Sequence, residues 1–326
     1  MATLEELSRH IETAGKLQAV VRTMKTISSV AIRRYELAEQ AMARYLETVE
    51  MGLQVVLRAL DGAEIESRAP RRGRTAVMLV GSEIGLCGAF NERLVAFALD
   101  SLATSGAAVE TRLVLTIGSR VDASWRAAAE PPDGHQQAPA TLEGLSHTVG
   151  AVLTRLDHWQ ENEGVDQLVL FYQRPGEMGA VTPVQTRLLP LDPAWLAGLR
   201  ARHWPSHRLP VPLGAPELLF RRLVRQLLFA RVFTAIIQSQ TVEHAERLEA
   251  MQAADHSIAE KIDELHIEHR RIRQNAITSE LLDIVSGYGA IMDEEPEEAA
   301  AEKDAQAVVR TAPPHPAPSS RAGSRT

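Results

Sequence analysis

Residues 217–286 read ELLFRRLVRQLLFARVFTAIIQSQTVEHAERLEAMQAADHSIAEKIDELHIEHRRIRQNAITSELLDIVS and contain neither glycine nor proline. The chain has 20 glycines and 17 prolines in 326 residues, so about eight would be expected in a stretch of this length. The run therefore predicts one long helix, which at about 1.5 Å per residue would span roughly 105 Å. That exceeds the diameter of a domain, so its apolar stripe must meet another long helix or another protein.

A second long helix is predicted at the start of the chain, where no proline occurs between Thr3 and Leu60. Mostly apolar residues recur there at an interval of seven: Leu7, Ala14, Val21, Ser28, Tyr35, Met42, Val49 and Val56. The later helix repeats the pattern with Ile237, His244, Met251, Ile258, Leu265 and Ile272. Two heptad helices that leave the same central domain from opposite ends of the chain can pair only as an antiparallel coiled coil.

Between the two helices the pattern changes to short apolar runs separated by amphipathic segments. The predicted strands are Thr75–Val80, Arg112–Ile117 and Asp166–Tyr172, with an edge strand near Val184–Leu189, and the predicted helices are Asn91–Leu102 and Leu142–Trp159. Turn-rich stretches at 131–135 and 209–216 are interpreted as loops. Strands that alternate with helices are typical of a three-layer α/β domain with a mostly parallel sheet.

These patterns predict four parts. They are an N-terminal shaft helix (1–69), a central α/β domain (70–210), a C-terminal shaft helix (211–292) and a disordered acidic and Pro-rich tail (293–326). The tail is acidic just after Met292 and then rich in proline and serine, so it cannot bury a core.

Composition excludes several classes of protein. Aromatic residues make up only 4% of the chain, as expected for extended helices, and a single cysteine excludes an internal disulfide framework. We expect no membrane span and no signal peptide, because no apolar run reaches about 18 residues and the first residues are acidic. A formal net charge of −7 argues against nucleic acid as the main partner.

The segment GSEIGLCGAFN, Gly81–Asn91, follows a predicted strand and opens a helix, where α/β domains bind phosphates. It lacks the Gly-Lys-Ser/Thr ending of a phosphate loop and the G-x-G-x-x-G spacing of a dinucleotide site. We therefore interpret Gly85, Cys87 and Gly88 as a structural turn, and Cys87 as a packing residue rather than a nucleophile. No cofactor, metal site or catalytic residue is predicted.

Two polar clusters on the last helix leave alternatives open. His266 and His269 stand three apart and could ligate zinc, but no third ligand is placed by the sequence, so solvated or seam-facing side chains are favoured. Arg270, Arg271 and Arg273 form a basic cluster. It either balances nearby glutamates on a solvated face or docks onto acidic loops of a partner.

The order helix, α/β domain, helix, together with three local strings, resembles the gamma subunit of F-type ATP synthases. The strings are GLCGAFN (Gly85–Asn91), TVEHAERLEAMQAAD (Thr241–Asp255) and RIRQNAITSELLDIVSG (Arg271–Gly287). The last one is similar to the family's Arg-Gln-x-x-Ile-Thr-x-Glu-Leu pattern. At the N-terminus TMKTISSVAIRR (Thr23–Arg34) also resembles a family segment, with Met24 and Arg33 retained.

The resemblance implies a non-catalytic rotor, present once per complex, that transmits torque to the catalytic hexamer of alpha and beta subunits. It also implies contacts with the epsilon subunit and the membrane ring of c subunits, at the cytoplasmic face of a bacterial inner membrane. The residues implied to contact the hexamer are Met24, Arg33, Arg247, Arg273, Gln274, Thr278 and Glu280. The alternative is a freestanding coiled-coil adaptor with an α/β recognition domain, and proximity of a gene for a beta-type subunit would discriminate between them.

Overall fold

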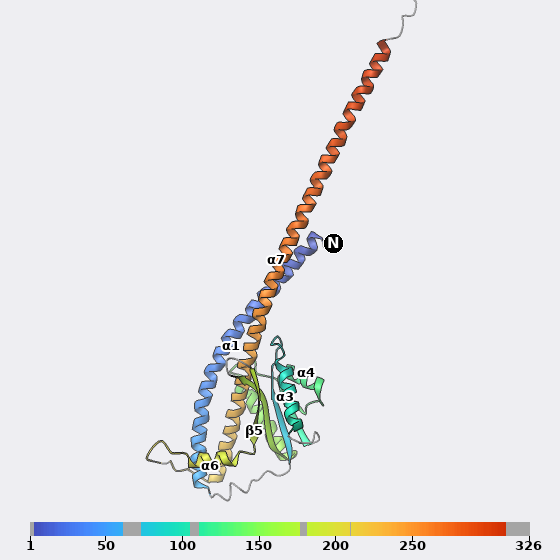
Figure 1. Ribbon diagram of the computed structural model, residues 1–326. Coiled ribbons are helices and arrows are strands. Elements are labelled where there is room, and N and C mark those ends of the chain that lie inside the picture. The colour runs from blue at the N-terminus through green and yellow to red at the C-terminus, as the bar shows by residue number, and fades with distance from the viewer. Residues whose placement is uncertain (1–2, 61–72, 105–110, 177–180, 209, 311–326) are drawn as a thin grey trace, which may run out of the picture. The chain divides into compact units, whose positions relative to one another are not determined.

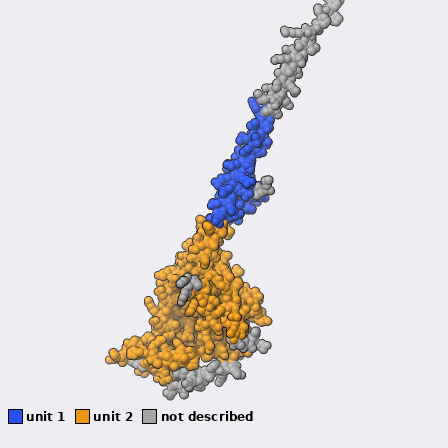
Figure 2. Space-filling model, viewed as in Figure 1, with its two compact units in different colours: residues 1–16, 259–326 blue, residues 17–258 orange. Residues whose placement is uncertain are grey.

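The computed structural model describes residues 3–60, 73–104, 111–176, 181–208 and 210–310, with side chains of the last helix as far as Tyr288. The chain divides into two compact units, residues 17–258 and residues 1–16 with 259–326 (Figure 2). The larger unit contains the whole sheet. The described helices are α1 Leu4–Ala59, α3 Phe90–Thr104, α4 Ser119–Ala128, α5 Leu145–Asn162, α6 Pro193–Ala201 and α7 Pro216–Arg310.

Five strands form one sheet in the order β3-β2-β1-β4-β5. Figure 1 labels its edge strand β5 and the helices α3 and α4. Their bounds are β1 Arg74–Val80, β2 Arg112–Ile117, β3 Gly134–Gln136, β4 Val165–Pro175 and β5 Val181–Leu189. β1 is parallel to both β2 and β4, β3 is parallel to β2, and β5 runs antiparallel to β4. The predicted α/β fold with a mostly parallel sheet is therefore confirmed, and the strand expected near Val184–Leu189 is its antiparallel edge.

Helices cover both faces of the sheet, because side chains of a strand alternate between its two faces. From β1, Val77 and Leu79 pack against α3 and α4. Met78 and Val80 face the other way and pack against α5 and against Val232–Ile237 of α7. The long helix α7 is thus part of the third layer of the domain, not an appendage beside it.

In the larger unit α1 and α7 run antiparallel, as predicted. Hydrogen bonds between the two helices join Tyr45 to Gln226 (2.6 Å), Glu39 to Gln238 (2.6 Å) and Lys25 to Asp255 (2.8 Å). In these three pairs, the higher the residue number in α1, the lower the number of its partner in α7, as expected for antiparallel helices.

The heptad residues lie where the spacing predicts. Val21, Tyr35 and Val49 of α1 are no more than 6% exposed, and so are Ile237 and Met251 of α7. Polar residues in or beside the heptad stripe make contacts within the chain. The ring of His244 stacks on that of Tyr35, with ring centroids 5.7 Å apart. Asp255, which lies beside the stripe, forms ion pairs with Lys25 and Arg22. Ser28 is fully buried, and its hydroxyl has no hydrogen-bond partner among the described residues.

The smaller unit brings the first turns of α1 together with residues 259 onward of α7. Leu7 is 2% exposed, and the hydroxyl of Ser8 lies 3.2 Å from Nε2 of His269. The seam-facing alternative is therefore the one that the structure supports for His269. In the same unit Leu281 and Ile284 are 57% and 62% exposed, so part of the apolar surface of α7 is left uncovered.

Three elements were not predicted. The loop expected at 131–135 contains the start of β3, which has only three residues and is defined by its pairing with the end of β2. Helix α4 follows the turn at Gly118, whose φ of 111° favours glycine. Helix α6 begins after Asp192, whose side chain accepts the N–H of Ala194 at 2.9 Å.

The helix boundaries also differ from the prediction. α1 ends at Ala59, and the predicted boundary at residues 69 and 70 lies outside the described residues. α7 continues past Met292 to Arg310, so residues 293–310 are helical where a disordered tail was predicted. Alanine and glutamate dominate that stretch, and both have high helix propensity. Residues 311–326 of the predicted tail lie outside the described residues.

Candidate functional site

The backbone of the turn after β1 packs closely against side chains of α3 and α4. Gly81 has no room for a side chain, because a Cβ atom there would lie 2.3 Å from Cβ of Val121 and 2.6 Å from Oδ1 of Asn91. Gly88 adopts a φ of 59°, a conformation that glycine reaches without strain. The Asn91 side chain accepts the backbone N–H of Ser82 at 3.0 Å and donates to its hydroxyl at 2.8 Å.

Glu83 ties this turn to the next loop of the sheet. Its carboxylate accepts three hydrogen bonds, from the backbone N–H and hydroxyl of Ser119 and from the N–H of Ala138. Burial alone would raise the pKa of Glu83, but these hydrogen bonds outweigh it and hold the pKa below its usual value. The carboxylate therefore acts as a hydrogen-bond acceptor that holds together the segments following β1, β2 and β3 at the carboxyl end of the sheet.

The carboxyl end of β1 is the topological switch point of the domain, because β2 lies on one side of β1 and β4 on the other. In doubly wound α/β domains this crevice is the usual ligand site. Here α7 reaches the same place. The hydroxyl of Ser239 donates to the carbonyl of Val80 at 3.1 Å, and Val242 packs on Cys87 and Phe90. The chain's own helix lies where a ligand would bind.

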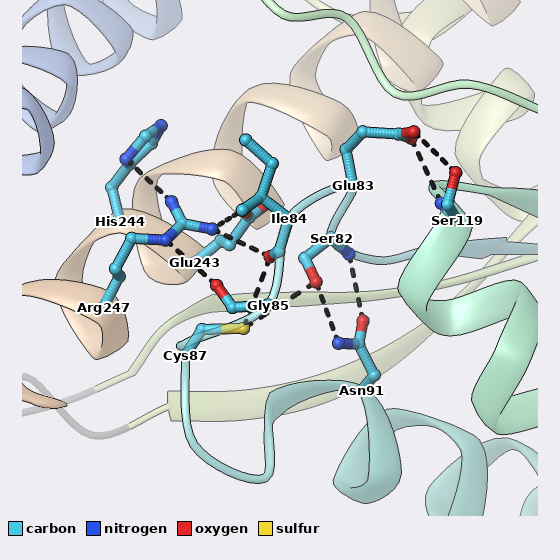
Figure 3. Close-up of polar contacts among 10 residues, drawn as sticks. All are labelled: Ser82, Glu83, Ile84, Gly85, Cys87, Asn91, Ser119, Glu243, His244 and Arg247. Atoms are coloured by element: carbon cyan, nitrogen blue, oxygen red, sulfur yellow. Dashed lines mark hydrogen bonds and ion pairs between the residues drawn. The ribbon is translucent and has the colours of Figure 1, made fainter. Parts of the chain in front are cut away.

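Arg247 of α7 makes the main polar contact at this junction (Figure 3). Its guanidinium donates to the carbonyls of Ile84 at 3.0 Å and Gly85 at 3.3 Å, and it forms an ion pair with Glu243 one helical turn away. Nη1 also lies 3.2 Å from Nδ1 of His244. Arg247 is 5% exposed, so this set of contacts, which we call the arginine clamp, is buried.

Burial changes the titration of the clamp residues. Desolvation raises the pKa of Glu243 to about 7, although the neighbouring Arg247 opposes the shift. Desolvation and the same guanidinium lower the pKa of His244 to about 4, so its ring is neutral near pH 7. One carboxylate oxygen of Glu243 has no hydrogen-bond partner among the described residues, which makes the ion pair with Arg247 its main compensation.

Cys87 lies inside the turn and is 1% exposed. Burial raises the pKa of its thiol, and its sulfur lies 3.7 Å from the hydroxyl of Ser82. A buried thiol with a raised pKa is a poor nucleophile, since the thiolate is the reactive form. These observations support the structural role predicted for Gly85, Cys87 and Gly88.

The predicted partner-contact residues fall into two groups. Arg273, Gln274, Thr278 and Glu280 are exposed on α7, Arg33 is exposed on α1 and pairs with Glu36, and Met24 is half-buried. Arg247, in contrast, is used inside the chain. Sequence reasoning missed its partner Glu243 and also the ion pair between Arg93 of α3 and Glu246 of α7 (2.9 Å). The spacing of Glu243 and Arg247, four residues apart, was the available signal.

Within the part of the chain that the structure describes, no cluster of three metal-ligating side chains occurs. No described helix is long and apolar enough to cross a bilayer. The described residues thus define a stalk-like class of protein, in which an antiparallel helix pair is rooted in an α/β domain and α7 lies over the carboxyl end of β1.

Comparison with known proteins identifies the family. The ATP synthase family model matches residues 3–291, so the chain belongs to that family. It is 26% identical over 293 residues to the ATP synthase gamma chain of two strains of Bacteroides fragilis, an alignment that covers 88% of this chain and 99% of the relative. The chain is accordingly a gamma-type central-stalk subunit, which has no catalytic site of its own.

Two of the solved structures with the same fold are of the mitochondrial ATP synthase of Euglena gracilis. The rotor in rotational state 1 aligns with a TM-score of 0.59 at 13% identity and covers 84% of this chain and 98% of that one. A chain of the OSCP/F1/c-ring structure in rotational state 3 aligns with a TM-score of 0.61 at 15% identity, covering 88% and 94%. These similarities concern the fold.

Proposed function

We propose that this chain is the rotating shaft of a rotary ATP synthase and is present in one copy per complex. Its helix pair lies inside a hexamer of alpha and beta subunits, and its α/β domain contacts the epsilon subunit and the membrane ring of c subunits. The family match over residues 3–291 supports this function and disfavours a freestanding adaptor. The bacterial source of the relatives supports a location at the cytoplasmic face of the inner membrane.

The arginine clamp is the observation that carries the mechanism. A torque applied to the α/β domain must reach α7 without slippage. Apolar side chains can slide past one another and form new contacts, whereas a hydrogen bond is lost when its donor and acceptor move apart. Arg247 binds two carbonyls of the turn after β1, and Ser239 binds the last carbonyl of the strand itself. These bonds fix the rotation of α7 about its own axis relative to the sheet.

The exposed polar residues of the helices are proposed to contact the hexamer. Arg273 is the strongest candidate, because a guanidinium makes charge-assisted hydrogen bonds to carboxylates and no ion pair engages it among the described residues. Gln274, Thr278 and Glu280 lie on the same segment of α7, and Met24 and Arg33 lie on α1. Because this contact surface is asymmetric, the shaft makes different contacts with each of the beta subunits at any one angle. As the shaft turns, these contacts favour a different nucleotide state in each beta subunit.

Coexpression with alpha and beta subunits tests this function. We expect the chain to co-purify with them and the complex to hydrolyse ATP. In vesicles that also contain the membrane sector, Arg247→Met should lower ion pumping per ATP hydrolysed, because the helix can then slip against the sheet. Arg126→Gln is the matched control, since Arg126 forms an exposed ion pair with Asp122 in the same domain.

Two results would contradict the proposal at different levels. Failure of the wild-type chain to join alpha and beta subunits would exclude the shaft function as a whole. Normal assembly of Arg247→Met with unchanged pumping per ATP would leave the function intact but remove the clamp from torque transmission.

A further inference from the structure

Three polar side chains of α1 stand four residues apart and contact the end of one short helix. Glu50, Gln54 and Arg58 share a face of α1, because residues four apart lie one helical turn from each other. Opposite them lies the carboxyl end of α6, where Ala201 is the last helical residue and Arg202 follows it. The three side chains therefore form one line of contacts along α1.

These contacts satisfy carbonyl groups that a helix leaves open at its carboxyl end. The Arg58 guanidinium donates to the carbonyls of Arg200 at 3.0 Å and Arg202 at 2.6 Å. The Gln54 amide also donates to the carbonyl of Arg202, whose side chain pairs with Glu50 at 3.1 Å. Because the carboxyl end of a helix carries a partial negative charge, a guanidinium is favourable there as well.

Apolar packing surrounds these hydrogen bonds. Gln54 is 1% exposed. Its neighbours Leu53 and Leu57 are buried in one cluster with Leu196 and Leu199 of α6. An isolated helix of nine residues is marginal in water, so the order of α6 depends on its contact with α1.

Helix α6 lies at the opposite edge of the sheet from the arginine clamp. Three residues separate α6 from the end of β5, whose hydrogen bonds to β4 attach it to the sheet. Because β5 runs antiparallel to β4, and β4 runs parallel to β1, α6 follows the edge at which β1 begins (Figure 1). The clamp holds α7 at the turn where β1 has ended. The two long helices are thus attached to opposite edges of one sheet.

We propose that, given the shaft function proposed above, Glu50, Gln54 and Arg58 are positioning residues that make α1 turn together with the α/β domain. We call these three residues, with Arg200 and Arg202 of the α6 end, the α1–α6 contact. It supplies α1 with an attachment of its own, as the arginine clamp does for α7.

Two attachments resist twisting of the helix pair better than one. With the clamp alone, a torque on the domain would drive α7, and α1 would follow only through its contacts with α7. The hydrogen bonds between the two helices join side chains on both sides, and such bonds can follow a moving partner by changes of rotamer. In the α1–α6 contact the acceptors of Gln54 and Arg58 are backbone carbonyls, which move only with their helix.

Amide hydrogen exchange of the purified full-length chain tests the contact itself. Gln54→Leu with Arg58→Met removes the donors and keeps side chains of similar length. The amides of α6 should then exchange roughly tenfold to a hundredfold faster, because hydrogen bonds from a charged donor are lost. The amides of α3 serve as the internal reference and should be unchanged. Unchanged exchange of α6 would overturn the proposal, since α6 would then not depend on α1.

Vesicles that contain the complete enzyme with its membrane sector test the transmission of torque. In the double variant, ion pumping per ATP hydrolysed should fall, while hydrolysis by the complex with alpha and beta subunits alone stays near the wild-type rate. A role in folding only would instead lower assembly and hydrolysis together, and that result would overturn the proposal. The matched control is Arg74→Gln, which removes an ion pair with Glu163 (2.7 Å) inside the domain and should leave pumping per ATP unchanged. An equal loss in the control would also contradict the proposal.

Milder variants keep the test decisive if the double variant does not fold. Arg58→Lys keeps the charge but offers one nitrogen in place of two, so its loss of pumping per ATP should be intermediate. Glu50→Gln leaves the bonds to the carbonyls in place and should lose least. The reverse order of these two variants would refute the role of the carbonyl bonds.

The wild-type chain separates this inference from the shaft function. If it does not join alpha and beta subunits, the shaft function is wrong and the role of the α1–α6 contact in torque is wrong with it. If it assembles and pumps, and the double variant pumps equally well per ATP, only the α1–α6 contact is removed from torque transmission.

Discussion

Two stretches of α7 differ sharply although they belong to one helix. Between Leu227 and Val242 buried side chains point in all directions, and Ala230, Val232 and Ile236 are fully buried in the larger unit. Between Leu281 and Val285, in the smaller unit, the apolar side chains are 57–66% exposed. The first stretch obtains its burial within the chain. The second must obtain it from other subunits, so folding and assembly depend on different parts of the same helix.

The largest effect on the isolated chain is expected at the clamp. Arg247→Met should lower the free energy of unfolding by about 3–5 kcal/mol, because it leaves Glu243 buried without its cation. Urea denaturation followed by circular dichroism measures this loss. Glu243→Gln with Arg247→Met should recover part of it, and a double variant no more stable than the single one would contradict the role of the ion pair.

Ile236→Ala should be nearly as destabilising, by about 3 kcal/mol, because the side chain is fully buried between the sheet and α7. The same denaturation experiment checks the value. A loss below about 1 kcal/mol would mean that this stretch of α7 is not packed on the sheet in solution.

The clamp should also make stability depend on pH, with two opposing contributions. Glu243 has a raised pKa in the folded chain, so its contribution is full below about pH 4.5 and is lost as pH rises through about 7. His244 has a lowered pKa, so its contribution is full above pH 6.5 and is lost as pH falls toward about 4. Each amounts to up to about 3 kcal/mol, since one pKa unit corresponds to about 1.4 kcal/mol.

Single variants separate the two contributions. Glu243→Gln should leave stability rising between pH 4.5 and 6.5, and His244→Asn should leave it falling between pH 4.5 and 7. Unfolding free energies measured across this range test both slopes. Identical pH profiles for the two variants would show that neither group is buried as described.

Further along α7 the expected effects are smaller. Asp255→Asn weakens the ion pairs with Lys25 and Arg22, which are partly exposed, so the loss of stability should be small and should shrink at high salt. Thermal unfolding at low and high salt would measure it. A salt-independent loss would indicate lost packing rather than lost charge pairing.

The smallest effect is expected in the exposed stretch. Ile284→Ala should change the stability of the isolated chain by less than about 0.5 kcal/mol, because the side chain is 62% exposed. In a complex with alpha and beta subunits the same variant should weaken assembly. An equal effect in both settings would remove the distinction between the two stretches of α7.

The sequence predicted the long helices, their antiparallel pairing and the central strands, because these follow from periodicity and from the absence of helix breakers. It did not predict β3 or α6, whose few residues are ordered by contacts with neighbouring elements. The family resemblance placed Arg247 among the residues that contact the hexamer, and the spacing of Glu243 and Arg247 does not by itself distinguish a buried ion pair from a solvated one. Only the position of α7 over the turn after β1 shows that this pair is buried.

The antiparallel pairing of the first and last long helices also affects how the chain is made. Val49 of α1 packs with Leu227 of α7 in one cluster, and about 180 residues separate them. At about 5–20 residues per second, the apolar stripe of α1 leaves the ribosome roughly 10–40 s before its partner is synthesised. During that interval an amphipathic helix is open to other nascent chains. We therefore expect newly made chains to depend on chaperones that shield α1 until translation has passed α7.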